Sequence, residues 1–283
     1  MRSPRLQITR FSTPLQQTGS TRPTDSLKPA TPRFEVIDAL RGFAMLWMTV
    51  FHFSFDLNNF GYIKQDFYSD PVWTWQRSII LSLFLFTAGF SQAVAVSQGQ
   101  SWLRFWRRWA QIAVCALLVT AGSYWMFPKT FIYFGVLHGM ALMLIAVRLT
   151  ARWGHRLWLL GTLTVLAGWV AGFVLLPSAL AELLNSRSLN WLGWVTRKPF
   201  TEDFVPLIPW LGVMWWGAAA GHWAVRRQPD WLQAPPPAGR HSIGLSGTAL
   251  LAGLGRWSLS YYMVHQPLMI GALTVIAWLA AHR

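Results

Sequence analysis

Four charged or titratable side chains interrupt a single apolar stretch near the N-terminus. They are Asp38, Arg41, His52 and Asp56. An imidazole beside a carboxylate can act as a general base, and a guanidinium group binds phosphate or carboxylate through paired hydrogen bonds. In a helix, the eleven residues from Arg41 to His52 make about three turns, which places both side chains on one face roughly 16 Å apart. The stretch therefore predicts a helix face with an anion-binding residue at one end and an acid–base residue at the other.

The closer spacings on this face predict two side-chain pairs. Asp38 lies three residues before Arg41 and Asp56 lies four residues after His52, so each pair is adjacent on a helix surface. A carboxylate paired with an imidazole holds the ring in one tautomer and raises its basicity. Gly42 leaves room for another backbone or a ligand. Singly, these residues also fit a solvated ion pair, a packing histidine and an interfacial acid, but together they favour one functional site.

Four further polar residues lie in or beside later apolar stretches and are candidates for a substrate pocket. They are His138, Asp203, His265 and Gln266. His265 and Gln266 precede Pro267, whose ring leaves a carbonyl of the preceding turn without its helical donor. Packing and function are equally good interpretations of His138. For Asp203 the acid of a helix N-terminus is the simpler interpretation, and contact with a substrate is the other.

The elements that must position these residues are transmembrane helices. The chain of 283 residues is 53% hydrophobic and 12% charged, about half the charge of a soluble domain. Seven apolar stretches approach the ~20 residues that cross a bilayer: 38–57, 73–97, 105–126, 130–148, 156–176, 204–224 and 257–280. The apolar stretch 243–255 is too short to span and is expected to be re-entrant or interfacial. We therefore expect an all-α bundle of about seven spans in the lipid bilayer.

The distribution of charge predicts the topology. Residues 1–32 are basic and rich in Pro, Ser, Thr and Gln, and we expect a disordered cytoplasmic arm before a transmembrane domain at 33–283. Most of the 24 Lys and Arg residues fall on the side of this arm, which predicts a cytoplasmic N-terminus and an outer C-terminus. The net charge of +14 therefore does not indicate nucleic-acid binding. Residues 228–240 contain four Pro and are expected to form an extended linker.

Metal and disulfide chemistry have little support in the sequence. Cys115 is the single cysteine and lies within an apolar stretch, so it cannot form an intramolecular disulfide. The seven His residues are scattered without the spacing of metal ligands. We therefore expect no metal cofactor.

An ordered set of motifs resembles the membrane acyltransferase superfamily. Within it, the chain is most similar to the branch of the heparan-alpha-glucosaminide N-acetyltransferase catalytic domain, which is widespread in bacteria. The resemblance covers about residues 33–270. The motifs are Ile37-Asp-Ala-Leu-Arg-Gly42 followed by His52, Leu83-Phe-Leu-Phe-Thr-Ala-Gly89, Phe134-Gly-Val-Leu-His-Gly139, the Asp203–Gly212 segment and the Gly255–Pro267 segment.

The resemblance implies acyl transfer across a bacterial cytoplasmic membrane. The donor would be cytoplasmic acyl-CoA, with acetyl-CoA expected, and the acceptor a hydroxyl or amine of a glycan or glycolipid on the outer side. His52 corresponds to the catalytic base of the superfamily, with Asp56 as its orienting carboxylate, and Arg41 to the residue on the CoA side, beside Asp38 and Gly42. In the lysosomal enzyme of this branch an Asn stands at the position of His52 and its active His matches Ile63, so its acceptor is not transferred to this chain.

Elementary chemistry agrees with this picture and leaves two alternatives open. A pantetheine arm is comparable in length to the separation of Arg41 and His52. The basic runs at 104–108 and 148–156 either attract a polyanionic nucleotide or only fix the topology. Buried His and Asp side chains also serve proton-coupled transporters, although we find no internal repeat of the kind such proteins contain. A non-catalytic membrane scaffold or sensor is the other alternative.

Overall fold

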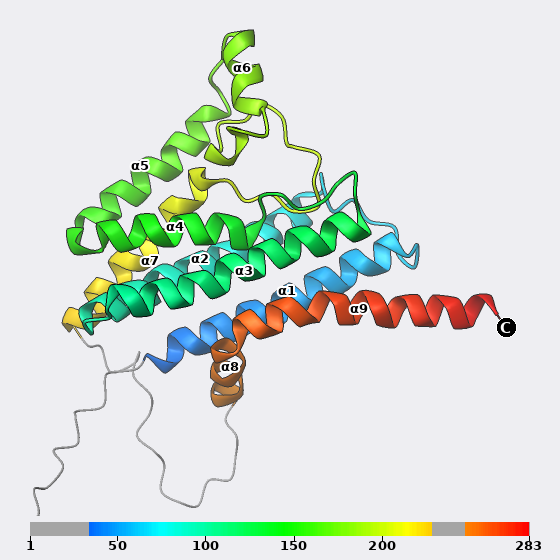
Figure 1. Ribbon diagram of the computed structural model, residues 1–283, viewed down its shortest axis with the longest axis horizontal. Helices are drawn as coiled ribbons and strands as arrows, with labels where there is room; N and C mark the ends of the chain where they lie inside the picture. Colours follow the sequence, from blue (N-terminus) through cyan, green and yellow to red (C-terminus); the bar gives the residue numbers. More distant parts are fainter. Residues whose placement is uncertain (1–33, 228–246, 283) are drawn as a thin grey trace, which may run out of the picture. The chain divides into compact units, whose positions relative to one another are not determined.

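The protein is all-helical over the part of the chain that the structure, a computed structural model, describes, namely residues 34–227 and 247–282. The helices are α1 (Glu35–Asn59), α2 (Pro71–Ser97), α3 (Trp102–Met126), α4 (Val136–Thr150), α5 (Arg156–Ala171), α6 (Ser178–Asn185), α7 (Leu207–Arg227), α8 (Gly247–Arg256) and α9 (Ser258–Ala281) (Figure 1). Two 3-10 turns, η1 (Ala151–Trp153) and η2 (Asn190–Leu192), complete them. The predicted arm at 1–32 and the linker at 228–240 lie outside the described residues.

Five of these helices are long and apolar enough to cross a membrane. They are α1, α2, α3, α9 and the continuous segment formed by α4 and η1. Helix α5 has 16 residues and would reach about 24 Å, less than the roughly 30 Å of a hydrocarbon core. Helix α7 has 21 residues and is built largely of Gly, Ala and Trp. The chain is therefore a multi-pass membrane protein, and the count of seven spans and the orientation stay predictions.

Each expected span contains a helix, but the fourth and fifth are shorter than predicted, since α5 ends at Ala171 rather than at residue 176. The fourth span was expected to begin at residue 130, whereas α4 begins at Val136. Residues 130–134 are instead non-helical and lie beside residues 202–205, where Glu202 N–H donates to the Thr130 carbonyl and Val205 N–H to the Phe134 carbonyl. The aromatic and β-branched side chains in this segment favour extended backbone. The short stretch at 243–255 forms α8 from residue 247 onwards, as a helix too short to span.

Small residues bring the central helices together. A Cβ added to Gly217 of α7 would overlap the carbonyl of Phe86 in α2, and one added to Gly221 would meet Phe90. The Gly-x-x-x-Gly pair of α7 therefore serves helix packing, as its spacing predicts. The largest core cluster is formed mainly by α2, α4 and α7, with fully buried Leu85, Met143 and Met214.

Helix α1 lies outside this core, between α2 on one side and α8 and α9 on the other. Figure 1 shows α9 running along α1 and the short α8 crossing it. The crossing is close because two glycines meet backbone: a Cβ at Gly42 would overlap the Leu251 carbonyl, and one at Gly255 would overlap the Asp38 carbonyl. These neighbours position the polar residues of α1.

Candidate active site

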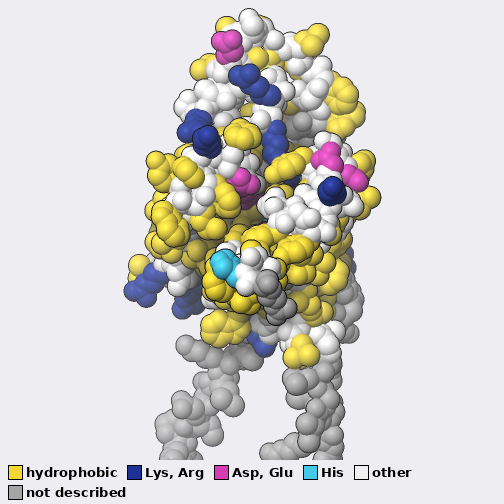
Figure 2. Space-filling view, turned by 90° about the vertical axis from the view of Figure 1, so that its right-hand side faces the viewer, with side chains coloured by type: hydrophobic (Ala, Val, Ile, Leu, Met, Phe, Trp, Pro, Cys, Tyr) yellow, Lys and Arg dark blue, Asp and Glu magenta, His cyan; other side chains and the backbone are white. Residues whose placement is uncertain are grey.

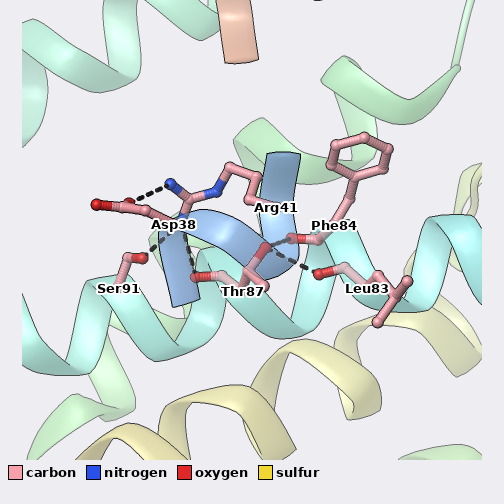
Figure 3. Close-up of polar contacts among 6 residues, drawn as sticks. All are labelled: Asp38, Arg41, Leu83, Phe84, Thr87 and Ser91. Carbon is pink, nitrogen blue, oxygen red and sulfur yellow. Dashed lines mark hydrogen bonds and ion pairs between the residues drawn. The ribbon is translucent and has the colours of Figure 1, made fainter. Parts of the chain in front are cut away.

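The first polar group of α1 is an arginine fixed against α2. Arg41 Nη1 lies 3.3 Å from Asp38 Oδ1, and Nη2 donates to Ser91 Oγ at 2.7 Å and to the Thr87 carbonyl at 3.2 Å (Figure 3). The predicted pairing of Asp38 with Arg41 is therefore confirmed. Thr87 Oγ1 donates to backbone carbonyls of its own helix, so the α2 side of this contact is itself well ordered. The guanidinium group is thus held in one orientation between the two helices.

Gly42 makes room for another helix. The sequence left open whether a ligand or another backbone approaches it, and in the structure the neighbour is the α8 backbone at Leu251. The glycine allows α8 to cross directly beside Arg41.

A cavity of about 210 Å³ lies beside Arg41. Its walls come from α1, α2, α3, α4, α9 and the turn that joins α2 to α3. Its polar lining residues are Arg41, Ser91, Gln92, Gln100, Arg108 and Ser258, and its apolar lining includes Phe84, Trp109 and Met140. The amide nitrogen of Gln92 is buried and has no hydrogen-bond partner within the described chain. Two guanidinium groups and an amide donor suit an anionic ligand such as a phosphate.

The two basic runs of the sequence contribute differently to this region. Arg108 lines the cavity. Arg148 is buried, its Nη1 donates to Gln100 Oε1 at 3.4 Å, and its guanidinium carbon lies 4.8 Å from the ring centre of Trp102. Arg148 therefore joins α4 to the start of α3. From the sequence alone this structural role could not be distinguished from attraction of a ligand.

The second polar group of α1 faces α9 rather than α2. His52 Nδ1 lies 2.9 Å from His265 Nε2, and the two rings are nearly coplanar, with an interplanar angle of 17° and centroids 5.2 Å apart. His265 Nδ1 lies 2.8 Å from the Tyr262 carbonyl oxygen. His265 is only 7% exposed, so the pair is enclosed on the α9 side.

The predicted pairing of Asp56 with His52 is wrong. Asp56 is 2% exposed, and its two carboxylate oxygens accept hydrogen bonds from Gln266 Nε2 at 2.8 and 3.1 Å. The spacing of four residues made the pair possible, but α9 packs along this face of α1 and offers a partner to each residue. Two successive residues of α9, His265 and Gln266, thus replace the single local contact.

One turn earlier a third polar contact joins the same two helices. Thr49 Oγ1 lies 2.7 Å from the Tyr261 hydroxyl. Tyr261 also stacks on His265 at an interplanar angle of 7°. Thr49, His52 and Asp56 therefore meet Tyr261, His265 and Gln266 in order, so that α1 and α9 run in the same direction through the site.

The remaining predicted pocket residues, His138 and Asp203, meet at the start of α4. Val136 N–H donates to Asp203 Oδ2 at 2.8 Å, and Gly135 N–H donates to His138 Nδ1 at 3.3 Å. The other ring nitrogen of His138 lies 3.0 Å from Thr120 Oγ1 of α3. Asp203 is thus the acid of a helix N-terminus, which was the simpler of its two interpretations. The helix is α4, however, and not α7, which follows Asp203 in the chain.

Charged groups surround Asp203 at the ends of the helices. Burial raises the pKa of the Asp203 carboxyl above its ordinary value, while its hydrogen bond from Val136 and the nearby charges of Arg77 and Lys198 act in the opposite direction. Burial likewise lowers the pKa of the Lys198 ammonium, which lies 5.0 Å from the ring centre of Tyr68. Figure 2 shows acidic and basic side chains among hydrophobic ones on the face toward which α9 runs.

Several residues of these contacts were not assigned from the sequence. Ser91 and Gln92 were detectable in principle, because polar residues inside an apolar helix are exceptional. Thr87 lies in a quoted motif, and Tyr261 precedes His265 by one helical turn. Among the described residues no three His, Cys, Asp or Glu side chains come together as metal ligands.

Comparison with known families now gives the arrangement a name. The family model described as heparan-alpha-glucosaminide N-acetyltransferase, catalytic, matches residues 33–267 and so includes both polar groups of α1 and their partners. No curated protein matches the chain, and no solved structure matches it. The resemblance found in the sequence motifs is confirmed by this match over most of the chain. With its apolar helices, the match indicates a membrane acyltransferase: the chain belongs to the heparan-alpha-glucosaminide N-acetyltransferase catalytic family.

Proposed function

We propose that this protein transfers an acyl group, expected to be acetyl, from cytoplasmic acyl-CoA to a sugar-containing acceptor. The acceptor is a glycan or glycolipid that presents a hydroxyl or amine on the outer side of a bacterial cytoplasmic membrane. One observation carries the proposal. Helix α1 joins an arginine beside a cavity with several polar lining residues to a hydrogen-bonded histidine eleven residues further along the same membrane-length helix.

The cavity beside Arg41 is the proposed site for phosphate groups of the donor. CoA is a polyanion, and Arg41 and Arg108 are the two cations in the cavity wall. Asp38, Thr87 and Ser91 orient the Arg41 guanidinium group. At about 210 Å³ the cavity suits a part of the nucleotide rather than the whole donor. Phosphates held here would leave the thioester near His52, because the pantetheine arm matches the roughly 16 Å between the two residues.

His52 is the proposed general base. It takes a proton from the acceptor hydroxyl or amine as the acceptor oxygen or nitrogen bonds to the thioester carbon. The carbon–sulfur bond then breaks, and the same proton passes from His52 to the leaving thiolate. Asp56 acts in this scheme through Gln266 and the placement of α9, since its carboxylate contacts Gln266.

Turnover of acetyl-CoA by the purified full-length chain in lipid nanodiscs tests the proposal. We expect thiol release and acetylated product by mass when envelope glycan or glycolipid fractions are supplied as acceptor. His52→Ala should reduce turnover by about 10²-fold or more, because general base catalysis contributes 10²- to 10⁴-fold. Acetyl-CoA binding should persist in this variant. His155→Ala is the matched control, since His155 is exposed at the start of α5.

Two results would contradict the proposal. Full turnover by His52→Ala would remove His52 from the reaction. Substrate flux in proteoliposomes without thioester turnover would instead favour a proton-coupled transporter, for which the buried pairs between α1 and α9 could carry protons.

A further inference from the structure

We infer that His265 is a positioning residue that fixes the tautomer of His52 and leaves His52 Nε2 as the basic nitrogen. The catalytic meaning of this inference rests on the proposed function, whereas the tautomer itself does not. A polar chain of three groups carries it: the Tyr262 carbonyl, the His265 ring and the His52 ring.

The chain has a fixed direction because it starts at a carbonyl. The Tyr262 oxygen can only accept a hydrogen bond, so the proton in the 2.8 Å contact belongs to His265 Nδ1. A neutral imidazole carries one N–H and one lone pair. His265 Nε2 therefore accepts, and the proton in the 2.9 Å contact belongs to His52 Nδ1. In a neutral His52 ring the remaining lone pair is then on Nε2.

Burial favours the neutral state of both rings. His265 is 7% exposed and lies within a membrane-length helix, where an unpaired charge costs several kcal/mol. The nearby carboxylate of Asp56 is already bonded to the Gln266 amide through both oxygens. A second proton on His265 would make His265 Nε2 the donor to His52 Nδ1, and the proton of a neutral His52 would then be on Nε2. The tautomer of His52 therefore distinguishes a neutral His265 from a charged one.

Neighbouring rings keep the His265 ring in the required plane. Its ring is nearly coplanar with the His52 ring, at 17°, as the hydrogen bond between their nitrogens requires, and is parallel to the Tyr261 ring, at 7°. Tyr261 is itself tied to α1 by its hydroxyl contact with Thr49. The His265 ring is thus held by its two ring neighbours, and its two nitrogens are aimed at the Tyr262 carbonyl and at His52.

The consequence for the reaction is a polarised base. When His52 Nε2 takes the proton of the acceptor, the ring becomes an imidazolium whose Nδ1–H remains bonded to His265 Nε2. The neutral His265 accepts this stronger, charge-assisted hydrogen bond. His265 therefore sets the tautomer and orientation of His52, as a carboxylate does in a Ser-His-Asp triad, but without the carboxylate's negative charge.

Nitrogen NMR of the full-length chain in lipid nanodiscs, with ¹⁵N-labelled histidine, tests the tautomer directly. The His52 signals are assigned by their loss in His52→Gln. We expect a protonated Nδ1 and an unprotonated Nε2 for His52. His265→Leu should abolish this preference, and His265→Gln should restore it, because the Gln oxygen can accept from His52 Nδ1. A protonated His52 Nε2 in the wild type, or an unchanged His52 tautomer in His265→Leu, would overturn the inference.

Kinetics supply the second measurement. His265→Leu should lower kcat for acetyl transfer by about tenfold or more, and His265→Gln should recover part of it. The KM for acetyl-CoA should stay unchanged in both variants, because His265 does not line the donor cavity. Equal kcat values in the wild type and His265→Leu would contradict the role of His265. If the wild type itself shows no turnover, the proposed function fails while the NMR result still decides the tautomer.

Discussion

The two ends of the polar face of α1 are held by different means. At the Arg41 end the neighbouring backbones approach closely, since Gly42 and Gly255 admit the crossing of α8. The charge of Arg41 is distributed over a carboxylate, a hydroxyl and a carbonyl beside a cavity. At the His52 end the contacts are side chain to side chain, and Thr49, His52 and Asp56 each have one partner on α9.

This difference follows from what each end would have to do. A cation that binds an anionic ligand must keep its charge, and the cost of holding it in a membrane falls when several oxygens surround it. A base must instead stay neutral until the acceptor arrives, which a neutral hydrogen-bonded partner allows. The comparison predicts that variants at one end change donor binding and that variants at the other change the chemical step.

The largest effect is expected from Gly42→Leu. A side chain at this position would overlap the Leu251 carbonyl, so α8 must move away from α1 beside Arg41. We expect loss of the folded protein or of donor binding, since overpacking against backbone costs several kcal/mol or more. Size-exclusion chromatography and thermal unfolding in detergent measure it. Gly271→Leu in α9 is the control, because no atom lies within 4 Å of its added Cβ. Equal thermal stability of the two variants would show that the crossing of α8 over α1 does not support the Arg41 end of the helix.

Arg108→Gln tests the donor end without disturbing the Asp38–Arg41 pair. Arg108 lines the cavity and is exposed, so its loss should leave the fold intact. We expect the KM for acetyl-CoA to rise about tenfold, equivalent to one charge-assisted hydrogen bond, with kcat unchanged. Arg104→Gln, one turn earlier on α3 and outside the cavity lining, is the matched control. A fall in kcat with an unchanged KM would place Arg108 at the chemical end instead.

Asp56→Asn distinguishes the observed contact from the one that the sequence predicted. If Asp56 oriented His52 as a carboxylate does in a triad, the amide would cost about 10⁴-fold in kcat. The structure bonds Asp56 to Gln266, and an Asn oxygen can still accept one of those hydrogen bonds. We therefore expect a loss of at most about tenfold, measured beside Asp56→Leu, which removes both bonds and should unfold the protein more readily. A loss near 10⁴-fold would restore the carboxylate to the reaction.

Local features of the fold were predictable from the sequence. Apolar runs near the length of a span located a helix for each stretch, and the Asp38–Arg41 pair follows from helix geometry alone. The non-helical segment at 130–134 was not predictable, because its residues are mostly apolar and only Gly135 separates them from α4. Its conformation depends on hydrogen bonds to residues 202–205, which are distant in the chain.

The candidate site shows the same limit more sharply. His52 and His265 are separated by 213 residues, so no spacing rule connects them. Each residue was singled out because a titratable group in a membrane segment is exceptional. Their partnership depends on the register of α9 against α1, which packing of the whole bundle decides. A local partner such as Asp56 was therefore preferred in the sequence, although the distant partner is the one that binds.

The smallest effect is expected from Asp203→Asn at the start of α4. Burial raises the pKa of this carboxyl, so the folded state holds its proton more tightly than the unfolded state does. Its contribution to stability is present below the ordinary aspartate pKa and is lost as pH rises through the raised value. Asn keeps an acceptor for Val136 N–H and has no charge to bury. We therefore expect the variant to match the wild type in acid and to equal or exceed its stability at neutral pH, by at most about 1 kcal/mol.

Thermal unfolding in detergent between about pH 4 and pH 8 measures this difference across the range where a buried aspartate titrates. Asp70→Asn is the control, because Asp70 also accepts from a backbone N–H at a helix start, 2.7 Å from Val72 N, but at an exposed site. A variant that loses stability at neutral pH and not in acid would mean that the Asp203 charge itself supports the fold. The Asp203 carboxylate would then form a stabilising group of charges with Arg77 and Lys198 beside the start of α4. The comparison of a charged Arg41 end with a neutral His52 end would then have to include this third, charged region.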